Sequence, residues 1–223
     1  GAAGVGVMFV GRGVAGDAVE VMGRIGADGA DRGVAWAKQV HSQRVVEVRE
    51  AGECGQADGL VTAERGLALA IVTADCVPVL LAGTGGIAAI HAGWRGIADG
   101  VVTAGVEALR QAGETQDETL LAWVGPAIGA CCYEVGDEVA AQVVAASGAQ
   151  VVTAGPGGRP HLDLPAAVRI QLAAAGVHEA YGPPRCTQCD AAHLWSYRGQ
   201  GRAAGRNYAY IWRTNSDPAA QSS

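Results

Sequence analysis

The chain has 223 residues, of which 49% are hydrophobic and 17% charged, a size and composition that fit one globular domain with a substantial core. Its net charge of −6 argues against a nucleic-acid-binding protein, since such proteins normally present a basic face to the phosphates. Because no apolar run approaches the roughly 20 residues that span a bilayer and residues 1–16 do not resemble a signal peptide, we expect a cytoplasmic protein with no membrane partner.

Apolar runs predict seven strands, at residues 5–10, 45–48, 67–72, 77–82, 87–90, 120–124 and 208–212. Three segments are predicted to be helical, at residues 97–112, 136–146 and 165–175, and Asp163 is the expected N-cap of the third. Strands occur in hairpins as well as before helices, which predicts an α+β fold. We expect a single domain with mixed β-sheets flanked by helices over residues 1–213, followed by a disordered C-terminal tail at 214–223.

The hairpin predicted from residues 77–82 and 87–90 brings two metal-binding side chains to its open end. If the turn at residues 83–86 pairs Ala82 with Ile87, His91 lies opposite Pro78 and Cys76 lies two residues further along the same face. Side chains that lean together there can share an ion about 2.0 to 2.3 Å from each ligand atom. The residues alone leave the alternative open that Cys76 is a small buried thiol and His91 a hydrogen-bonded core histidine.

The turn that follows His91 favours an anion. Residues 92–96 lead into the predicted helix, whose N-terminus offers free backbone N–H groups, and Arg95 adds a fork-shaped donor. The pattern is weak by itself, because many strand-to-helix turns contain glycine without a ligand. Four further histidines are candidates for a third metal ligand, and His41 is one of them.

Six cysteines in a chain with no expected export signal should be reduced. Cys131 and Cys132 precede the helix predicted from residue 136, whose dipole can acidify a thiol. Cys186 and Cys189 have the CxxC spacing of a zinc knuckle or a redox pair. One CxxC without a second pair is a weak signal, and small buried thiols are the commoner outcome. The sequence therefore assigns no role to these four cysteines.

Several motifs occur together along the chain. They are KQVH at residues 38–41, ADG at 57–59, TADCVP at 73–78, HAGWRG at 91–96, VGPAIG at 124–129 with CCYEV at 131–135, and CT at 186–187 followed by SYR at 196–198 and GR at 205–206. In this order they resemble the YfiH/PgeF family, long labelled laccase-domain or multicopper polyphenol oxidase, from about Trp36 to Trp212. The chain departs from the family at residues 193–195, where members usually show a pair of aromatic residues.

The resemblance implies a zinc ion, with copper as the alternative metal, bound by the histidine of QVH, the cysteine of TADC and the histidine of HAGWRG, here His41, Cys76 and His91. Three protein ligands leave a fourth position open, as in catalytic zinc sites. It also implies activity on purine nucleosides, as a purine nucleoside phosphorylase and adenosine deaminase, with adenosine, inosine, methylthioadenosine and phosphate as small-molecule substrates.

Three further residues are candidates for this chemistry. Asp75 can transfer a proton or orient a ligand, and Arg95 and Arg206 can bind phosphate, although either arginine can equally be a surface ion-pair partner. A purine needs a flat apolar slot, and five aromatic residues lie near the C-terminus: Trp195, Tyr197, Tyr208, Tyr210 and Trp212. The alternation of the last three fits a strand face at least as well as a stacking platform.

Other functions stay open. In one hypothesis the protein is an amidase that edits a peptidoglycan precursor, with Cys76 as nucleophile and His91 as base. In another it stores metal or acts as a scaffold without catalysis. A laccase-like polyphenol oxidase is disfavoured, because its copper centres use about ten histidines and the chain has five. The axial methionine of a blue-copper site would also have to be Met8 or Met22, which both lie near the N-terminus.

Overall fold

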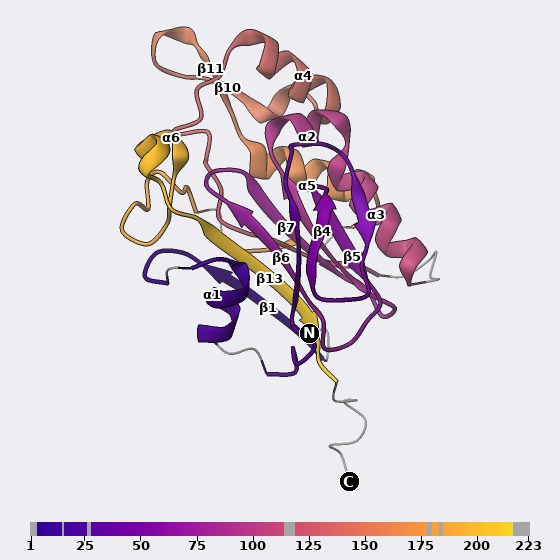
Figure 1. The fold of residues 1–223 in the computed structure, drawn as a ribbon. Helices are drawn as coiled ribbons and strands as arrows, with labels where there is room; N and C mark the ends of the chain where they lie inside the picture. The colour runs from indigo at the N-terminus through magenta and orange to yellow at the C-terminus, as the bar shows by residue number, and fades with distance from the viewer. Residues whose placement is uncertain are drawn as a thin grey trace.

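The structure, a computed structural model, describes residues 4–14, 16–25, 28–113, 119–177, 180–182 and 185–215. Two β-sheets stack face to face, and helices cover their outer faces (Figure 1). The predicted α+β class with mixed sheets is confirmed. None of the helices that the structure describes is both long and apolar enough to cross a membrane.

The first sheet has five strands in the order β1-β13-β6-β2-β4. These are β1 (Val5–Val10), β2 (Val34–Lys38), β4 (Gly52–Gln56), β6 (Ala68–Thr73) and β13 (Asn207–Arg213). Strand β13 pairs antiparallel with β1 and β6, whereas β2 pairs parallel with β4 and β6. The strands predicted at residues 5–10, 67–72 and 208–212 therefore all belong to this sheet, whereas β2 and β4 were not predicted.

The second sheet has six strands in the order β12-β9-β7-β8-β5-β3. These are β3 (Val45–Glu47), β5 (Gly59–Thr62), β7 (Val77–Ala82), β8 (Ile87–Ala92), β9 (Leu121–Val124) and β12 (Ala180–Tyr181), and a separate two-stranded sheet contains β10 (Val152–Ala154) and β11 (Pro160–Leu162). The β7–β8 hairpin pairs Ala82 with Ile87 and Pro78 with His91, which confirms the predicted register.

Helices pack on both outer faces. Helix α1 (Ala18–Ile25) covers the five-stranded sheet, and α2 (Trp94–Asp99), α3 (Val101–Ala112), α4 (Asp137–Ser147) and α5 (Leu164–Ala174) cover the six-stranded sheet (Figure 1). Shorter pieces are α6 (Tyr197–Gln200), η1 (Ala149–Val151), η2 (Pro156–Gly158) and η3 (Gly201–Ala203). Asp163 accepts a hydrogen bond from the Ala166 N–H, which confirms it as the N-cap of α5.

The prediction of one continuous helix over residues 97–112 was wrong. Gly100 adopts a left-handed φ of 89°, so the segment divides into α2 and α3, and α2 begins three residues earlier than predicted, at Trp94. Glycine accepts this φ without the steric cost that a side chain would add. Helix α1 was not predicted.

The central strands are buried on both faces because successive side chains of a strand point to opposite sides. On β7, Leu80 belongs to the apolar layer between the two sheets, and Leu81 belongs to the layer between the six-stranded sheet and its helices. On β13, Tyr208 and Tyr210 lie in the third layer, beneath α1. Of the two interpretations of the C-terminal aromatic residues, the strand face is therefore the one observed for Tyr208, Tyr210 and Trp212.

The last described residues of the chain lie beside the first ones. The N–H of Thr214 donates to the Gly4 carbonyl at 2.7 Å, and the Asn215 side chain donates to Asp31 at 2.7 Å. Residues 216–223, which make up most of the predicted tail, lie outside the described residues.

The two layers around β7 can be tested with adjacent leucines. Leu80 and Leu81 both have 0% exposure, so we expect Leu80→Ala and Leu81→Ala each to lower the free energy of unfolding by about 2–5 kcal/mol, measured by urea denaturation. Val19, on α1, is 44% exposed, and Val19→Ala should change stability by less than about 0.5 kcal/mol. A near-neutral result for either leucine would contradict a packed layer on that side of β7.

Candidate metal centre and pocket

Three side chains from separate segments converge at one edge of the stacked sheets. His41 follows β2, Cys76 lies in the connection from β6 to β7, and His91 lies near the end of β8. The ligand atoms of these residues all lie within 4.8 Å of one another, and Cys76 Sγ is 3.8 Å from His41 Nε2. The two imidazole rings meet edge to face, with centroids 4.8 Å apart. The predicted convergence of a thiol and two imidazoles is therefore seen in the structure.

A buried carboxylate orients the His91 ring and holds the backbone of the segment that contains His41. Asp58 has 0% exposure and accepts hydrogen bonds from the backbone N–H groups of Val40, His41 and Ser42 and from the Ser42 hydroxyl. His91 Nδ1 lies 2.8 Å from Asp58 Oδ1 and donates to it. This bond fixes the tautomer and leaves Nε2 of His91 available to Cys76 or to a metal, an arrangement common among metal-binding histidines.

The same contacts control the charges in the cluster. Burial alone would raise the pKa of Asp58, but hydrogen bonds from His91, Ser42 and His41 hold it well below its usual range. Burial would also raise the pKa of Cys76, yet the two histidines lower it to about 6. The pKa of His91, which burial would lower, is raised to about 9 by Asp58 and Cys76. Cys76 is therefore poised as a thiolate, the form that binds metals and acts as a nucleophile.

The backbone is strained where the site is built. His41 (φ 62°) and Asp75 (φ 99°) are the two non-glycine residues with positive φ in the described part of the chain. Such conformations persist only where the surroundings hold them. The His41 N–H is bound to Asp58. The two carboxylate oxygens of Asp75 each accept a 2.6 Å hydrogen bond, from the Thr187 hydroxyl and from the Arg198 N–H.

Gly93 has no side chain, and the side chains of His41 and Cys76 occupy the space where one would lie. A Cβ atom at this position would lie 2.8 Å from Cδ2 of His41 and 3.1 Å from Sγ of Cys76. The first distance is shorter than real Cβ contacts, so any side chain here would push the ring away. The close approach of the metal-binding groups therefore depends on a residue without a side chain.

A cavity of about 540 Å³ opens beside the cluster. It is lined by all six predicted site residues, His41, Asp75, Cys76, His91, Arg95 and Arg206. Three aromatic rings, those of Trp94, Tyr133 and Tyr197, also line it, together with Arg198. Its volume lies within the range of small-molecule sites, and its lining combines flat apolar walls with a few polar groups.

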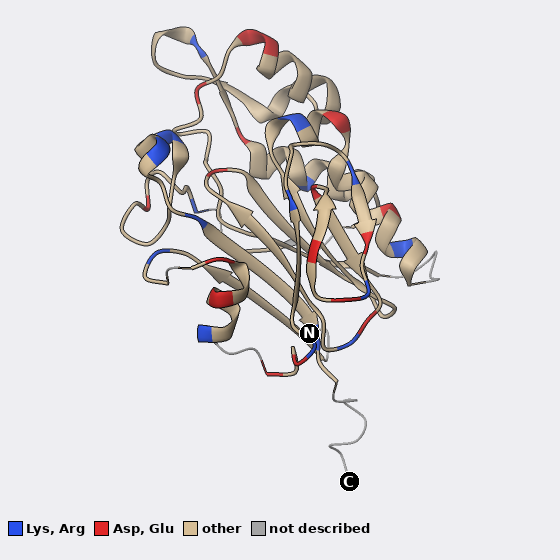
Figure 2. Ribbon diagram, viewed as in Figure 1, with Lys and Arg blue, Asp and Glu red and all other residues tan. Residues whose placement is uncertain are grey.

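Three guanidinium groups face this cavity although the chain as a whole is acidic. Arg95 lies over the Trp94 ring at 4.4 Å, Arg198 lies over the Tyr133 ring at 5.0 Å, and Arg206 donates to backbone carbonyls. Figure 2 shows basic residues on α6 and at the start of β13. Within the described residues no carboxylate forms an ion pair with these three arginines, so their charge is available to an anion.

Sequence reasoning missed Asp58 as the group that orients the histidines, although its ADG motif was noted, and it missed Arg198, Trp94 and Tyr133 as pocket residues. Among the predicted aromatic candidates only Tyr197 lines the cavity, and Trp195 instead lies beneath Arg12 at 4.0 Å. The other described histidines lie elsewhere: His161 Nδ1 contacts the Ala130 carbonyl, and His193 contacts Asp190. His178 lies outside the described residues.

The donor set fits a metal. One thiolate and two neutral imidazoles are the usual ligands of zinc, and three protein ligands leave room for a reactant. The same donors suit a blue-copper centre, which adds a weak axial methionine. Met8 and Met22 both pack in the layer between α1 and the five-stranded sheet, and neither lines the cavity. The structure thus contains a His/Cys cluster that can hold a metal and lacks the methionine typical of blue copper beside it.

Known proteins share the sequence and the fold. Residues 14–214 match the family described as multi-copper polyphenol oxidoreductase laccase. The chain is 44% identical to the Streptomyces coelicolor protein named purine nucleoside phosphorylase SCO2081, over 80% of this chain and 74% of that protein. It is 35% identical to the Shigella flexneri protein named purine nucleoside phosphorylase YfiH, over 79% and 72%. The crystal structure of YlmD from Geobacillus stearothermophilus superposes with a TM-score of 0.84, at 29% identity, over 95% of this chain and 93% of YlmD.

Removing the charge of Asp58 tests its orienting role. In Asp58→Asn an amide NH₂ group replaces one acceptor oxygen. In one orientation this NH₂ group faces backbone N–H donors, and in the other it faces His91, which then loses its acceptor. We expect zinc affinity to fall about 10- to 100-fold, measured by competition with a chromophoric chelator for the zinc equivalent that His41→Ala abolishes. Asp17→Asn is the control, because Asp17 also accepts backbone N–H groups but lies at the start of α1. Unchanged affinity in Asp58→Asn would contradict the role.

Proposed function

The chain belongs to the YfiH-type family described as multi-copper polyphenol oxidoreductase laccase, and we propose that it is a zinc-dependent enzyme that acts on purine nucleosides. The proposed reactions are phosphorolysis of adenosine, inosine and methylthioadenosine and deamination of adenosine. One observation carries the proposal: a single cavity combines the His/Cys cluster, three aromatic rings and three arginines that form no ion pair with a carboxylate of the described residues. The names of the relatives support the same substrate class.

His41, Cys76 and His91 would hold the metal. A bound zinc supplies a Lewis acid with an open coordination position. The absence of a methionine from the cavity lining and the small number of histidines favour zinc over a set of copper centres. We propose zinc as the working metal of this site for that reason.

The arginines suit the second substrate of a phosphorolysis. An oxygen of inorganic phosphate attacks C1′ of the ribose, the bond from C1′ to the purine nitrogen breaks, and the purine leaves with the electron pair and takes up a proton. Arg95, Arg198 and Arg206 can bind the phosphate and offset its charge, since guanidinium groups bind phosphate oxygens two at a time. The rings of Trp94 and Tyr197 offer flat surfaces for the purine.

Deamination uses water in place of phosphate. Water adds to C6 of adenine, and ammonia leaves, so this reaction needs the metal cluster but no phosphate site. The sequence predicts that Asp75 acts either as a proton-transfer group or as an orienting group. Because both of its oxygens already accept short hydrogen bonds, from Thr187 and Arg198, we propose that it positions the cavity wall next to Cys76.

A second candidate function rests on a specific observation. Cys76, His91 and Asp58 form a chain of contacts in which a thiolate faces an imidazole that is held by a carboxylate. This is also the arrangement of a cysteine hydrolase, and it keeps the peptidoglycan-editing amidase hypothesis open. The two functions differ in their need for metal, since a cysteine nucleophile works without one.

The nucleoside reaction is tested with chromatography of the products. With adenosine as substrate, the zinc-loaded protein should release adenine only when phosphate is present. It should release inosine from adenosine with or without phosphate. Because both reactions use the metal, chelation and His91→Ala should each lower both rates at least about 100-fold, and zinc should restore the chelated wild type. Activity on nucleosides that survives in metal-free protein would overturn the proposal. Hydrolysis of a muramoyl substrate by metal-free protein with an acyl group trapped on Cys76 would favour the amidase.

The phosphate site is tested separately from the metal. Arg206→Ala removes a charged donor from the cavity and should raise the KM for phosphate about 10- to 100-fold, while the KM for adenosine and the rate of deamination change little. Arg202→Ala is the matched control, because Arg202 is exposed nearby but does not line the cavity. Equal losses in phosphorolysis and deamination would show that Arg206 does not act through phosphate.

A further inference from the structure

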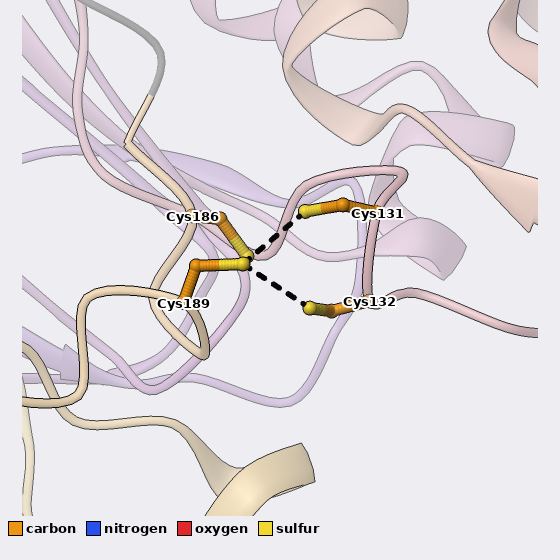
Figure 3. Close-up of side chains that lie close together, drawn as sticks. All are labelled: Cys131, Cys132, Cys186 and Cys189. Carbon is orange, nitrogen blue, oxygen red and sulfur yellow. Dashed lines mark hydrogen bonds between the residues drawn. The ribbon is translucent and has the colours of Figure 1, made fainter.

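Four cysteines that the cavity does not use meet a short distance from it. Cys131 and Cys132 lie on the turn after β9, and Cys186 and Cys189 lie on the segment that leads to α6 (Figure 3). Their Sγ atoms all lie within 4.8 Å of one another, and Cys189 Sγ is 3.5 Å from both Cys131 Sγ and Cys132 Sγ. Two pairs that are 54 or more residues apart in the sequence thus form one four-sulfur cluster.

We propose that this cluster is a second metal site, in which the four cysteines bind one zinc ion through their thiolates. In a tetrahedral site with zinc–sulfur bonds of about 2.3 Å, neighbouring sulfurs are about 3.8 Å apart. The separations in the cluster, from 3.5 Å to at most 4.8 Å, bracket that value. Four protein ligands close the coordination shell, so the site is structural and leaves no position for a substrate.

Burial argues against simple packing of four thiols. Cys131 and Cys189 are exposed, and Cys132 and Cys186 are only half-buried, whereas cysteines that serve as small hydrophobes are among the most buried residues. Cys132 and Cys186 pack against the apolar core, but the exposed thiols of Cys131 and Cys189 gain little from the hydrophobic effect. A metal ion gives these side chains a reason to converge at the surface.

The backbone around Cys186 supports a thiolate. The Gly129 N–H donates to Cys186 Sγ at 3.3 Å, and the backbone N–H groups of Gln188 and Cys189 also hydrogen-bond this sulfur. Amides directed at the first sulfur of a CxxC turn offset the negative charge that several thiolates bring to one ion. The segment therefore has the form of a zinc knuckle, and Cys131 and Cys132 supply the second pair of ligands.

The site would join two walls of the nucleoside cavity. Tyr133, directly after Cys132, lines the cavity, and Thr187, directly after Cys186, donates to Asp75 at 2.6 Å. Backbone bonds already link the two segments, since the Thr187 N–H donates to the Ala127 carbonyl at 3.0 Å. A zinc ion bound to both segments would fix them against each other without taking part in the chemistry of the cavity.

Metal counting on the full chain tests the proposal. Reduced protein loaded with zinc and freed of excess ion should carry two zinc equivalents in native mass spectrometry. His41→Ala should carry one, Cys189→Ser should carry one, and the double variant should carry none. Cys54→Ser is the matched control and should keep both, because Cys54 lies on β4 outside both clusters.

Two results would overturn the inference. One is a single zinc in the wild type that His41→Ala removes completely, which would leave the four cysteines without metal. The other is a disulfide between Cys189 and Cys131 or Cys132 in protein kept under reductant, which would identify a redox pair. If Cys189→Ser fails to fold, the zinc that remains in His41→Ala decides the question. The two clusters share no ligand, so failure here would leave the proposed nucleoside activity intact.

Zinc bound by the four cysteines should also raise the thermal stability of the protein. We expect zinc to raise the thermal midpoint of the His41→Ala variant, since binding to the folded state alone stabilises it, and to have no such effect on His41→Ala combined with Cys189→Ser. An equal rise in both variants would contradict a site made by the four cysteines.

Discussion

A single buried carboxylate organises the candidate metal centre. Asp58 lies between the segment that carries His41 and the strand that carries His91, and its oxygens accept hydrogen bonds from both. Burying a charge costs free energy unless hydrogen bonds replace those that it made with water. The five groups that donate to Asp58 provide these hydrogen bonds. Because the buried charge needs these donors, Asp58 holds the ring of His91 and the backbone of His41 in a fixed relation to each other.

The two sheets share in building the site. His41 follows β2 of the five-stranded sheet, His91 belongs to β8 of the six-stranded sheet, and Cys76 lies where the chain crosses from one sheet to the other. The distance between the ligands consequently depends on how the sheets pack, through the apolar layer that contains Leu80. Small changes in that layer can reach the candidate metal centre, because close-packed interiors transmit strain.

The parts of the molecule governed by local pattern could be predicted from sequence. Strand alternation and a four-residue turn gave the β7–β8 register, and with it the placement of His91 opposite Pro78. The break at Gly100 was missed because an apolar helical pattern continues across it. Asp58 was missed because its role depends on donors from two distant segments. The cysteine cluster was missed for the same reason, since Cys131 and Cys189 are separated by 58 residues and spacing carries no information about their distance.

The two proposed metal sites differ in a way that charge explains. A divalent ion with one thiolate and two neutral imidazoles keeps a net positive charge, which adds to the nearby arginines and favours a phosphate in the cavity. A divalent ion with four thiolates carries a net negative charge, which suits a site bounded by backbone N–H groups and would repel the same anion. In this proposal the ligand chemistry separates the roles: the open, cationic centre would face the substrate, and the closed, anionic one would hold the wall of the cavity.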